Sequence, residues 1–144
     1  MKKLFLIIIL ITVFTNCSSN KNQISDSTCI VDYDFKNGRE VYTKVDVEPK
    51  LIAETDFVNY FLERIITKES YVDDKPKLKF AFEFNIEKKG KVSSVNFINK
   101  KGKELNDIEN DAVEIIMNTN WKPAKCNGRE VVFLKKVNIF FNLD

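Results

Sequence analysis

Histidine is absent from the 144-residue chain, which removes the side chain that most often serves as general base, metal ligand or member of a catalytic triad. Glycine occurs only four times, and no glycine-rich loop that could cradle a phosphate is present. Asp73-Asp74 has no further zinc ligands near it in the sequence and is typical of a turn. We therefore expect no enzyme, no catalytic residue, no metal and no cofactor. A carboxylate pair in a cleft is the one catalytic arrangement left open.

The chain also lacks a strong excess of one charge. Its formal net charge is +2, and Lys2 and Lys3 belong to a leader segment, so the remainder is close to neutral. Nucleic-acid binding depends on clustered cations that neutralise phosphates, and a nucleic-acid partner is therefore disfavoured. The lysine-rich runs at 88–91 and 100–103 are typical of solvated turns.

The one long apolar run lies at the N-terminus. Lys2-Lys3 precedes eleven mainly apolar residues, Leu4 to Phe14, which are too few to span a bilayer and are typical of an export signal. Phe14-Thr15-Asn16-Cys17 resembles a bacterial lipobox, although Asn16 stands where a small residue is usual. The resemblance implies a signal peptide over residues 1–16 and a lipid on Cys17. A plain secretory leader that is cleaved elsewhere is the alternative.

Residues 17–40 are expected to form a lipid-anchored tether, with a short hairpin at its end. Ser18 to Gln23 has little hydrophobicity, as in flexible linkers. A lipid on Cys17 would hold the protein on a membrane surface. The absence of Asp after Cys17 resembles outer-membrane sorting more than inner-membrane sorting. We expect a cell-envelope protein that faces the periplasm.

Two further cysteines, Cys29 and Cys126, remain once Cys17 is assigned to the lipid. In an oxidising compartment two such thiols are more often paired than free. We predict a disulfide that joins the start of the folded region to the turn after Trp121. Two unpaired thiols are the alternative.

The first half of the folded region contains a turn signal and a helix signal. Asn37-Gly38 lies between two apolar-rich segments and predicts a hairpin, because both residues tolerate positive φ. Thr55 or Asp56 can cap a following helix. One stripe of that helix is entirely apolar and is assigned to the core: Phe57, Val58, Phe61, Leu62, Ile65 and Ile66.

Apolar and polar residues alternate from Lys77 to Glu87, which predicts a strand with one buried and one solvent-exposed face. The wet face is assigned to Lys79, Glu83, Asn85 and Glu87. A second strand is expected around Val92 to Ile98, and a helix from Asn106 or Asp107, with Glu109 placed for a capping box. A last strand is expected from Glu130 to Leu143. These stripes together indicate an α+β two-layer sandwich, with two helices on a three- to four-stranded antiparallel sheet.

The stretch Trp121-Lys122-Pro123-Ala124-Lys125-Cys126-Asn127-Gly128 connects the second helix to the last strand. Pro123 is expected to stop the helix and Asn127-Gly128 to form a turn. The string resembles the C-terminal domain of TonB-type proteins, whose last helix ends in Trp-Lys-Pro-(Gly/Ala)-Lys before a polar loop and a closing strand. The resemblance covers residues 41–144, although Leu51-Ile52-Ala53-Glu54 replaces the usual Phe-Pro-Gly-Gly.

The resemblance implies binding by strand addition, in which an extended peptide pairs with an open sheet edge. The partner would be the N-terminal box of a TonB-dependent outer-membrane transporter or a related envelope protein. The receiving strand is expected to use Val132, Leu134, Lys136, Asn138, Phe140 and Asn142. A structural lipoprotein that self-associates, for example as a homodimer, is one alternative. A short TonB energy transducer for transmembrane transport, with an uncleaved leader, is the other.

Overall fold

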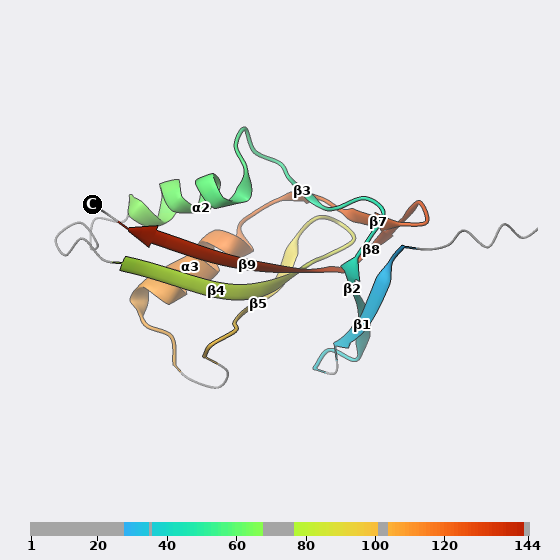
Figure 1. Ribbon diagram of the computed structural model, residues 1–144, viewed down its shortest axis with the longest axis horizontal. Coiled ribbons are helices and arrows are strands. Elements are labelled where there is room, and N and C mark those ends of the chain that lie inside the picture. Colours follow the sequence, from blue (N-terminus) through green and yellow to red (C-terminus); the bar gives the residue numbers. More distant parts are fainter. Residues whose placement is uncertain (1–27, 35, 68–76, 101–103, 143–144) are drawn as a thin grey trace, which may run out of the picture.

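The computed structural model describes residues 28–34, 36–67, 77–100 and 104–142. Its main feature is a five-stranded sheet of order β1-β2-β9-β4-β5 (Figure 1). In chain order these strands are β1 Ile30–Asp34, β2 Arg39–Lys44, β4 Lys77–Ile86, β5 Val92–Phe97 and β9 Phe133–Asn142. Two small pairs complete the strands: β3 Lys50–Leu51 with β6 Trp121–Lys122, and β7 Ala124–Cys126 with β8 Arg129–Val131.

The expected α+β class is confirmed, but the sheet is larger than expected. It has five strands rather than three or four, because the β1–β2 hairpin joins it through β2. The β2–β9 pair is also parallel, whereas all other strand pairs described are antiparallel. Part of the segment that the sequence assigned to the tether is therefore a strand of the main sheet.

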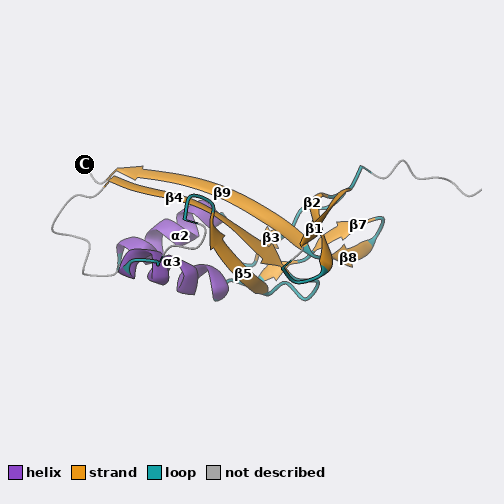
Figure 2. Cartoon of the chain, turned by 90° about the horizontal axis from the view of Figure 1, so that it is seen from below, coloured by secondary structure: helices purple, strands orange, loops and turns teal. Residues whose placement is uncertain are grey.

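Two helices, α2 Phe57–Ile66 and α3 Asp107–Met117, lie on one face of this sheet (Figure 2). Asp56 caps α2 by accepting from the backbone N–H groups of Val58 and Asn59. Asn106 caps α3, and its predicted capping box with Glu109 is present. Both helices thus begin at residues that the sequence indicated.

The core between helices and sheet is built largely from phenylalanine rings. Phe61 of α2 and Phe82 and Phe84 of β4 are completely buried. The ring centroids of Phe61 and Phe82 lie 5.6 Å apart. Truncation of one such ring to alanine typically lowers the free energy of unfolding by about 3–5 kcal/mol. The alternation in β4 therefore predicted the buried face of the sheet correctly.

Trp121 has a different local setting from the one predicted. Helix α3 ends at Met117, with Asn118 as its C-cap, so Pro123 does not stop it. Trp121 instead starts β6 and is 4% exposed, and its Nε1–H donates to Thr119 Oγ1 at 2.8 Å. Lys122 pairs with Lys50 of β3. The predicted turn at Asn127-Gly128 is confirmed, because both residues have positive φ between β7 and β8.

The predicted last strand, Glu130 to Leu143, is divided in two. Its first residues belong to β8, which pairs with β7, and β9 begins only at Phe133. Val132 lies between these two strands, and its carbonyl accepts a hydrogen bond from the Tyr42 N–H at 2.8 Å. The apolar pattern is continuous here, although the pairing partner changes from β7 to β4.

Several predictions concern residues outside the described part of the chain. These are the leader, Cys17 and the start of the tether, the Asp73-Asp74 turn and most of the 100–103 lysine run. Within the described residues, no helix is long and apolar enough to cross a membrane.

Candidate functional site

The outer edge of β9 is the first candidate site. On one side β9 pairs with β4 along its whole length, from Phe133↔Ile86 to Asn142↔Lys77. On the other side it pairs with β2 only at Tyr42↔Phe133. Among the described residues, no strand pairs with this side of β9 beyond Phe133. We call this stretch, Leu134 to Asn142, the open edge.

The direction of the backbone groups along the open edge follows from the neighbouring ladder. The Ile98 N–H donates to the Ala81 carbonyl at 2.8 Å, so Ala81 directs its backbone groups toward β5. Residues of an antiparallel strand alternate in this direction, and Phe80, Phe82 and Phe84 therefore face β9. Their partners in register are Ile139, Val137 and Lys135. The residues between and beyond these partners direct their N–H and C=O groups outward: Leu134, Lys136, Asn138, Phe140 and Asn142.

Five of the six predicted strand residues thus share the outward side of β9, and Val132 does not belong with them. Its carbonyl is already bonded to Tyr42, and it lies before β9 begins. The motif residues Trp121, Lys122 and Pro123 lie elsewhere in the fold, on the β3–β6 pair and just beyond it. They serve packing and pairing rather than the open edge.

The side chains along the open edge combine apolar and cationic groups. Phe140 is 70% exposed, and the Lys79 Nζ lies 5.1 Å from its ring centroid. Lys136 is 60% exposed and lies 3.8 Å from Glu83 on β4. Aromatic side chains, phenylalanine among them, are enriched at protein interfaces.

A covalent link holds the beginning of the sheet. The sulfur atoms of Cys29 and Cys126 are 2.15 Å apart and form a disulfide, the pair that the sequence predicted. It spans 97 residues, for which the chain-entropy model gives about 4–5 kcal/mol of stabilisation. The bond fixes the residue before β1 to the β7–β8 hairpin.

Asp46 lies beside this disulfide. Its carboxylate accepts from the Asn127 backbone N–H at 2.6 Å and from the Thr28 hydroxyl at 2.8 Å. These bonds, that from Asn127 foremost, lower the pKa of Asp46. Cys29, Asp46 and Cys126 together have the spacing of a metal site. Because both sulfurs are bonded to each other, neither is the thiolate that a metal would bind.

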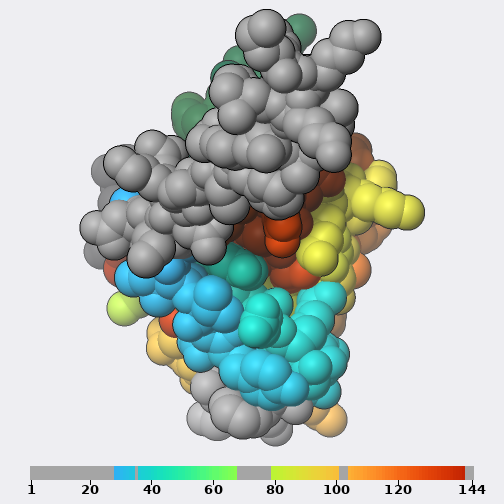
Figure 3. All heavy atoms as spheres, turned by 90° about the vertical axis from the view of Figure 1, so that its right-hand side faces the viewer, coloured from blue at the N-terminus to red at the C-terminus, as the bar shows by residue number. Residues whose placement is uncertain are grey.

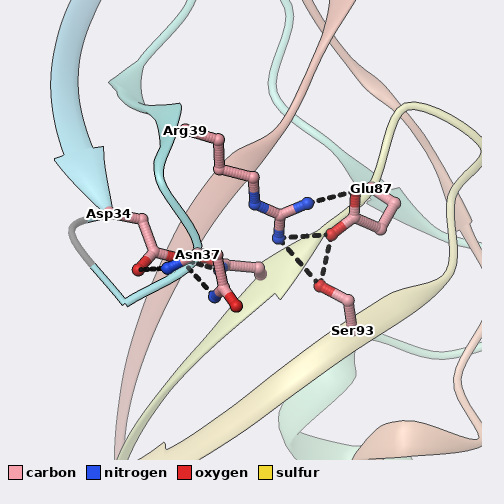
Figure 4. Close-up of polar contacts among 6 residues, drawn as sticks. Asp34, Asn37, Arg39, Glu87 and Ser93 are labelled. Carbon is pink, nitrogen blue, oxygen red and sulfur yellow. Dashed lines mark hydrogen bonds and ion pairs between the residues drawn. The ribbon is translucent and has the colours of Figure 1, made fainter.

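The second candidate site is a groove between the β1–β2 hairpin and the sheet face opposite the helices. Arg39 of β2 forms a bidentate ion pair with Glu87, with distances of 2.7 and 3.0 Å, and also donates to Ser93 Oγ at 3.1 Å (Figure 4). Ser93 donates in turn to Glu87. Figure 3 shows the hairpin in blue and cyan beside the yellow residues of the β4–β5 connection. The hairpin is therefore held over β4 and β5.

The space between them, which we call the hairpin groove, is open to solvent on one side and has a volume of about 580 Å³. Asp32, Asp34, Arg39 and Val41 line it from the hairpin, and Glu83, Asn85, Ser94, Asn96, Leu134 and Lys136 line it from the sheet. Tyr33, Lys36, Asn37 and Ser93 complete the lining. The sequence assigned this sheet face to water, and for Asn85 this is wrong. Asn85 is only 4% exposed because the hairpin covers it.

Two polar atoms in this region are buried without a hydrogen-bond partner among the described residues: Asn85 Oδ1 and Arg39 Nε. A buried polar group without a partner typically destabilises a fold by about 1–3 kcal/mol. Asn85 Nδ2 donates to Asp34 Oδ2 at 3.3 Å. A flipped amide would place two oxygens together, so this bond fixes the orientation of Asn85 Oδ1.

Asp34 is the best-connected carboxylate of the groove. The Asn37 side chain donates to it at 2.7 Å, and this bond is the main reason that the pKa of Asp34 is lowered. Asp34 is thus ionised at neutral pH and is not poised to act as a general acid.

The described residues offer backbone hydrogen bonds at the open edge and polar contacts in the groove. Comparison with protein-family models, with curated proteins and with solved structures found no match to this chain.

Proposed function

We propose that the protein is a binding module that captures an extended peptide on the open edge of β9 by strand addition. The observation that carries the proposal is the outward side of β9 from Leu134 to Asn142, with which no described strand pairs. Such an edge supplies main-chain hydrogen bonds to an added strand, and the flanking side chains supply selectivity.

The length of the open edge suits this role. Nine residues from Leu134 to Asn142 follow the single bridge to β2, and strands in globular proteins are usually shorter than this. Phe140 would contact an apolar side chain of the incoming strand, and Lys136 would favour an acidic one. The added peptide would therefore be apolar with some acidic character.

The partner class comes from the resemblance to TonB C-terminal domains. The peptide would be the N-terminal box of a TonB-dependent outer-membrane transporter or a segment of a related envelope protein. The protein would face the periplasm, anchored through a lipid on Cys17. In this arrangement it is an accessory module for transport and not a motor-driven transducer, because a lipid anchor does not connect to a motor within the bilayer.

The test is an NMR titration of the full-length, ¹⁵N-labelled protein in detergent with synthetic transporter box peptides. We expect shifts at Lys136, Asn138 and Phe140 and their neighbours on β9. The Asn138→Pro variant removes one outward N–H without removing a bond to β4, and it should abolish binding. The Asn138→Ala variant keeps the backbone donor and should bind as the unmodified protein does.

Binding that is equal in the proline and alanine variants would rule out strand addition at this edge. If no box peptide binds, TonB-dependent transporters are ruled out as the partner. Self-association is then examined by measuring the mass in solution of the same two variants. A dimer that Asn138→Pro dissociates would assign the open edge to a second copy. Mass spectrometry of the mature N-terminus tests the third alternative, a transducer. A lipid adduct on Cys17 is expected for a peptide-binding or self-associating lipoprotein, whereas an uncleaved leader is expected for a transducer.

A further inference from the structure

We propose that the protein has a second binding surface, which takes the headgroup of an anionic phospholipid in the membrane that holds the protein. This inference rests on the lipid anchor of the proposed function but uses no residue of the open edge. The surface is a groove of about 810 Å³ between β2, the turn that joins β4 to β5, and β8. We call it the basic groove. Its volume is in the range found for small-molecule sites.

The floor of the basic groove is apolar. Tyr42 of β2 lines it together with Val131 and Val132. The two valines are each 7% exposed, so they close the bottom of the groove and are not part of its rim. The exposed Lys88 and Lys89 add the methylene stems of their side chains, and the lining below the charged rim is mainly apolar. The groove therefore suits a ligand that carries an apolar part beside its charge.

The rim of the basic groove has an excess of positive charge. Arg39 and Glu87 both line it and neutralise each other through their ion pair. The other charged residues of the lining are four cations and two carboxylates, which leave a formal charge of +2: Lys88, Lys89, Lys91, Arg129, Glu40 and Glu130. An anionic ligand is therefore attracted to the groove and a cationic one repelled.

Three of these cations have no partner of their own. Lys91 donates to Asn120 Oδ1. The side chains of Lys88, Lys89 and Arg129 are exposed and make no hydrogen bond, ion pair or ring contact with another described residue. Phosphate oxygens accept charge-assisted hydrogen bonds from both ammonium and guanidinium groups. A phosphate group bound at the rim would therefore use donors that the fold itself does not use.

The basic groove lies at the end of the molecule where the tether joins the fold. Arg129 pairs with Cys126 across the β7–β8 ladder. The disulfide joins Cys126 to Cys29, with 6.2 Å between their Cα atoms. Tyr42 and Val131 of the groove floor belong to the same apolar cluster as these two cysteines. The cationic rim is therefore close to the point at which the anchored chain enters the structure.

The tether is short enough to keep this end of the molecule near the membrane. Eleven residues join a lipid on Cys17 to Thr28, and they span at most about 40 Å when fully extended. An anionic membrane surface attracts basic residues that come within about one Debye length of it. The anchor raises the local concentration of headgroups, which a free anion in solution lacks. A membrane phospholipid is therefore favoured as the source of the phosphate.

The experiment follows the amides of the full-length, ¹⁵N-labelled protein in dodecyl maltoside micelles while phosphatidylglycerol is added. A parallel titration uses phosphatidylcholine, whose headgroup has no net charge. Phosphatidylglycerol should shift the amides of Lys88, Lys89, Lys91 and Val131 and leave those of α3 unmoved, whereas phosphatidylcholine should shift none of them. The response should weaken as salt is raised.

A matched pair of double variants tests whether the attraction is local. Lys88→Gln/Lys89→Gln should raise the phosphatidylglycerol fraction needed for half the shift at least tenfold, since one basic residue near an anionic surface contributes about fivefold. Lys50→Gln/Lys122→Gln removes two exposed lysines that face each other on β3 and β6 and do not line the groove. It should leave the response unchanged. Equal losses in the two variants would overturn the assignment of the groove.

Three further results would overturn the proposal. The first is an equal response to phosphatidylcholine. The second is an equal response to inorganic phosphate at 10 mM, which would make the ligand a free anion. The third is a response to tetraglutamate but not to phosphatidylglycerol, which would make it an acidic peptide.

The same samples separate this inference from the proposed function. If phosphatidylglycerol has no effect while box peptides still shift β9, only the basic groove loses its ligand. If mass spectrometry finds no lipid on Cys17 while phosphatidylglycerol shifts the groove amides, the anchor is wrong and the lipid site stands. Lys88→Gln/Lys89→Gln should bind box peptides as the unmodified protein does, because neither lysine lies on the open edge.

Discussion

The Tyr42 N–H donates to the Val132 carbonyl at 2.8 Å, and this bond marks the point at which β2 and β9 part. After Lys44 the chain turns to form a bridge between Val47 and Lys125, so it does not continue beside β9. The open edge is therefore a consequence of topology. It arises because β2 is parallel to β9 but overlaps only its first residue.

The contact between Gly90 and Trp121 gives a first test of the fold. Gly90 has φ +75°, and a Cβ added there would lie 1.8 Å from the Trp121 carbonyl oxygen. We expect Gly90→Ala to lower the free energy of unfolding by about 2–4 kcal/mol, from backbone strain and a clash with another backbone segment. The single tryptophan reports unfolding in urea by its fluorescence.

Gly128→Ala is the matched control for this substitution. Gly128 also has positive φ, but nothing lies within 4 Å of its added Cβ. Only the conformational strain of about 1–2 kcal/mol is expected there. Equal losses in the two variants would show that the Gly90 turn does not pack against Trp121.

The ion pair that holds the hairpin gives a second prediction. The Arg39 and Glu87 side chains are 31% and 25% exposed and share two hydrogen bonds. Arg39→Met keeps the apolar stem but leaves Glu87 without its guanidinium. We expect a loss of about 1–2 kcal/mol in urea unfolding, discounted for partial exposure. Faster amide exchange of β1 should accompany it, because the hairpin would detach first.

Lys136→Met serves as the control for the ion pair. Lys136 is 60% exposed and stands 3.8 Å from Glu83, so its removal should change stability by less than about 0.5 kcal/mol. A loss for Lys136→Met as large as that for Arg39→Met would contradict the assignment of Arg39 as the residue that holds the hairpin.

The pKa of Asp46 leads to a prediction about pH. The pKa of Asp46 is lower in the folded than in the unfolded chain, so its ionisation stabilises the fold. The stabilisation is present at pH values above the unfolded-state pKa, which is about 3.9 for aspartate. This stabilisation is lost as pH falls from about 4 through the folded pKa. Asp46→Asn offers only one acceptor for Thr28 and Asn127, and should therefore lower the melting temperature at pH 7.

The difference between the unmodified protein and Asp46→Asn should shrink when the melts are repeated at successively lower pH below about 4, as the carboxylate becomes protonated in the folded protein. A difference that stays constant across this pH range would show that the hydrogen bonds to Asp46 do not depend on its charge. Asp34 shares the direction of the pKa shift but lies in the hairpin groove. Asp46→Asn is therefore the cleaner variant for this test.

The local elements were predictable because their signals are local. Asn37-Gly38 gave the hairpin turn, Asp56 and Asn106 the helix starts, and the alternation around Phe82 the buried face. Each depends on backbone conformation or periodicity within a few residues. The partner of Cys29 was predictable because only one other cysteine remained once Cys17 was set aside.

The arrangement between elements was less predictable. Alternation shows which face of a strand is buried but does not show which strand lies beside it. The apolar run through Val131, Val132 and Phe133 therefore read as one strand, although its partner changes from β7 to β4 at this point. The sequence predicted that Asn85 is exposed, because the hairpin that covers it comes from residues about 50 positions earlier. The hairpin groove left no local signal for the same reason.

The most direct measurement of the central claim is residue-specific amide hydrogen exchange along β9, made by NMR on the full-length protein. If the edge is open, the outward amides of Lys136, Asn138 and Phe140 exchange rapidly, while those of Val137 and Ile139, bonded to β4, exchange slowly. An added peptide should then slow the outward amides selectively. Slow exchange of Lys136 and Asn138 in the free protein, equal to that of Val137, would show that the edge is already covered and would contradict the account.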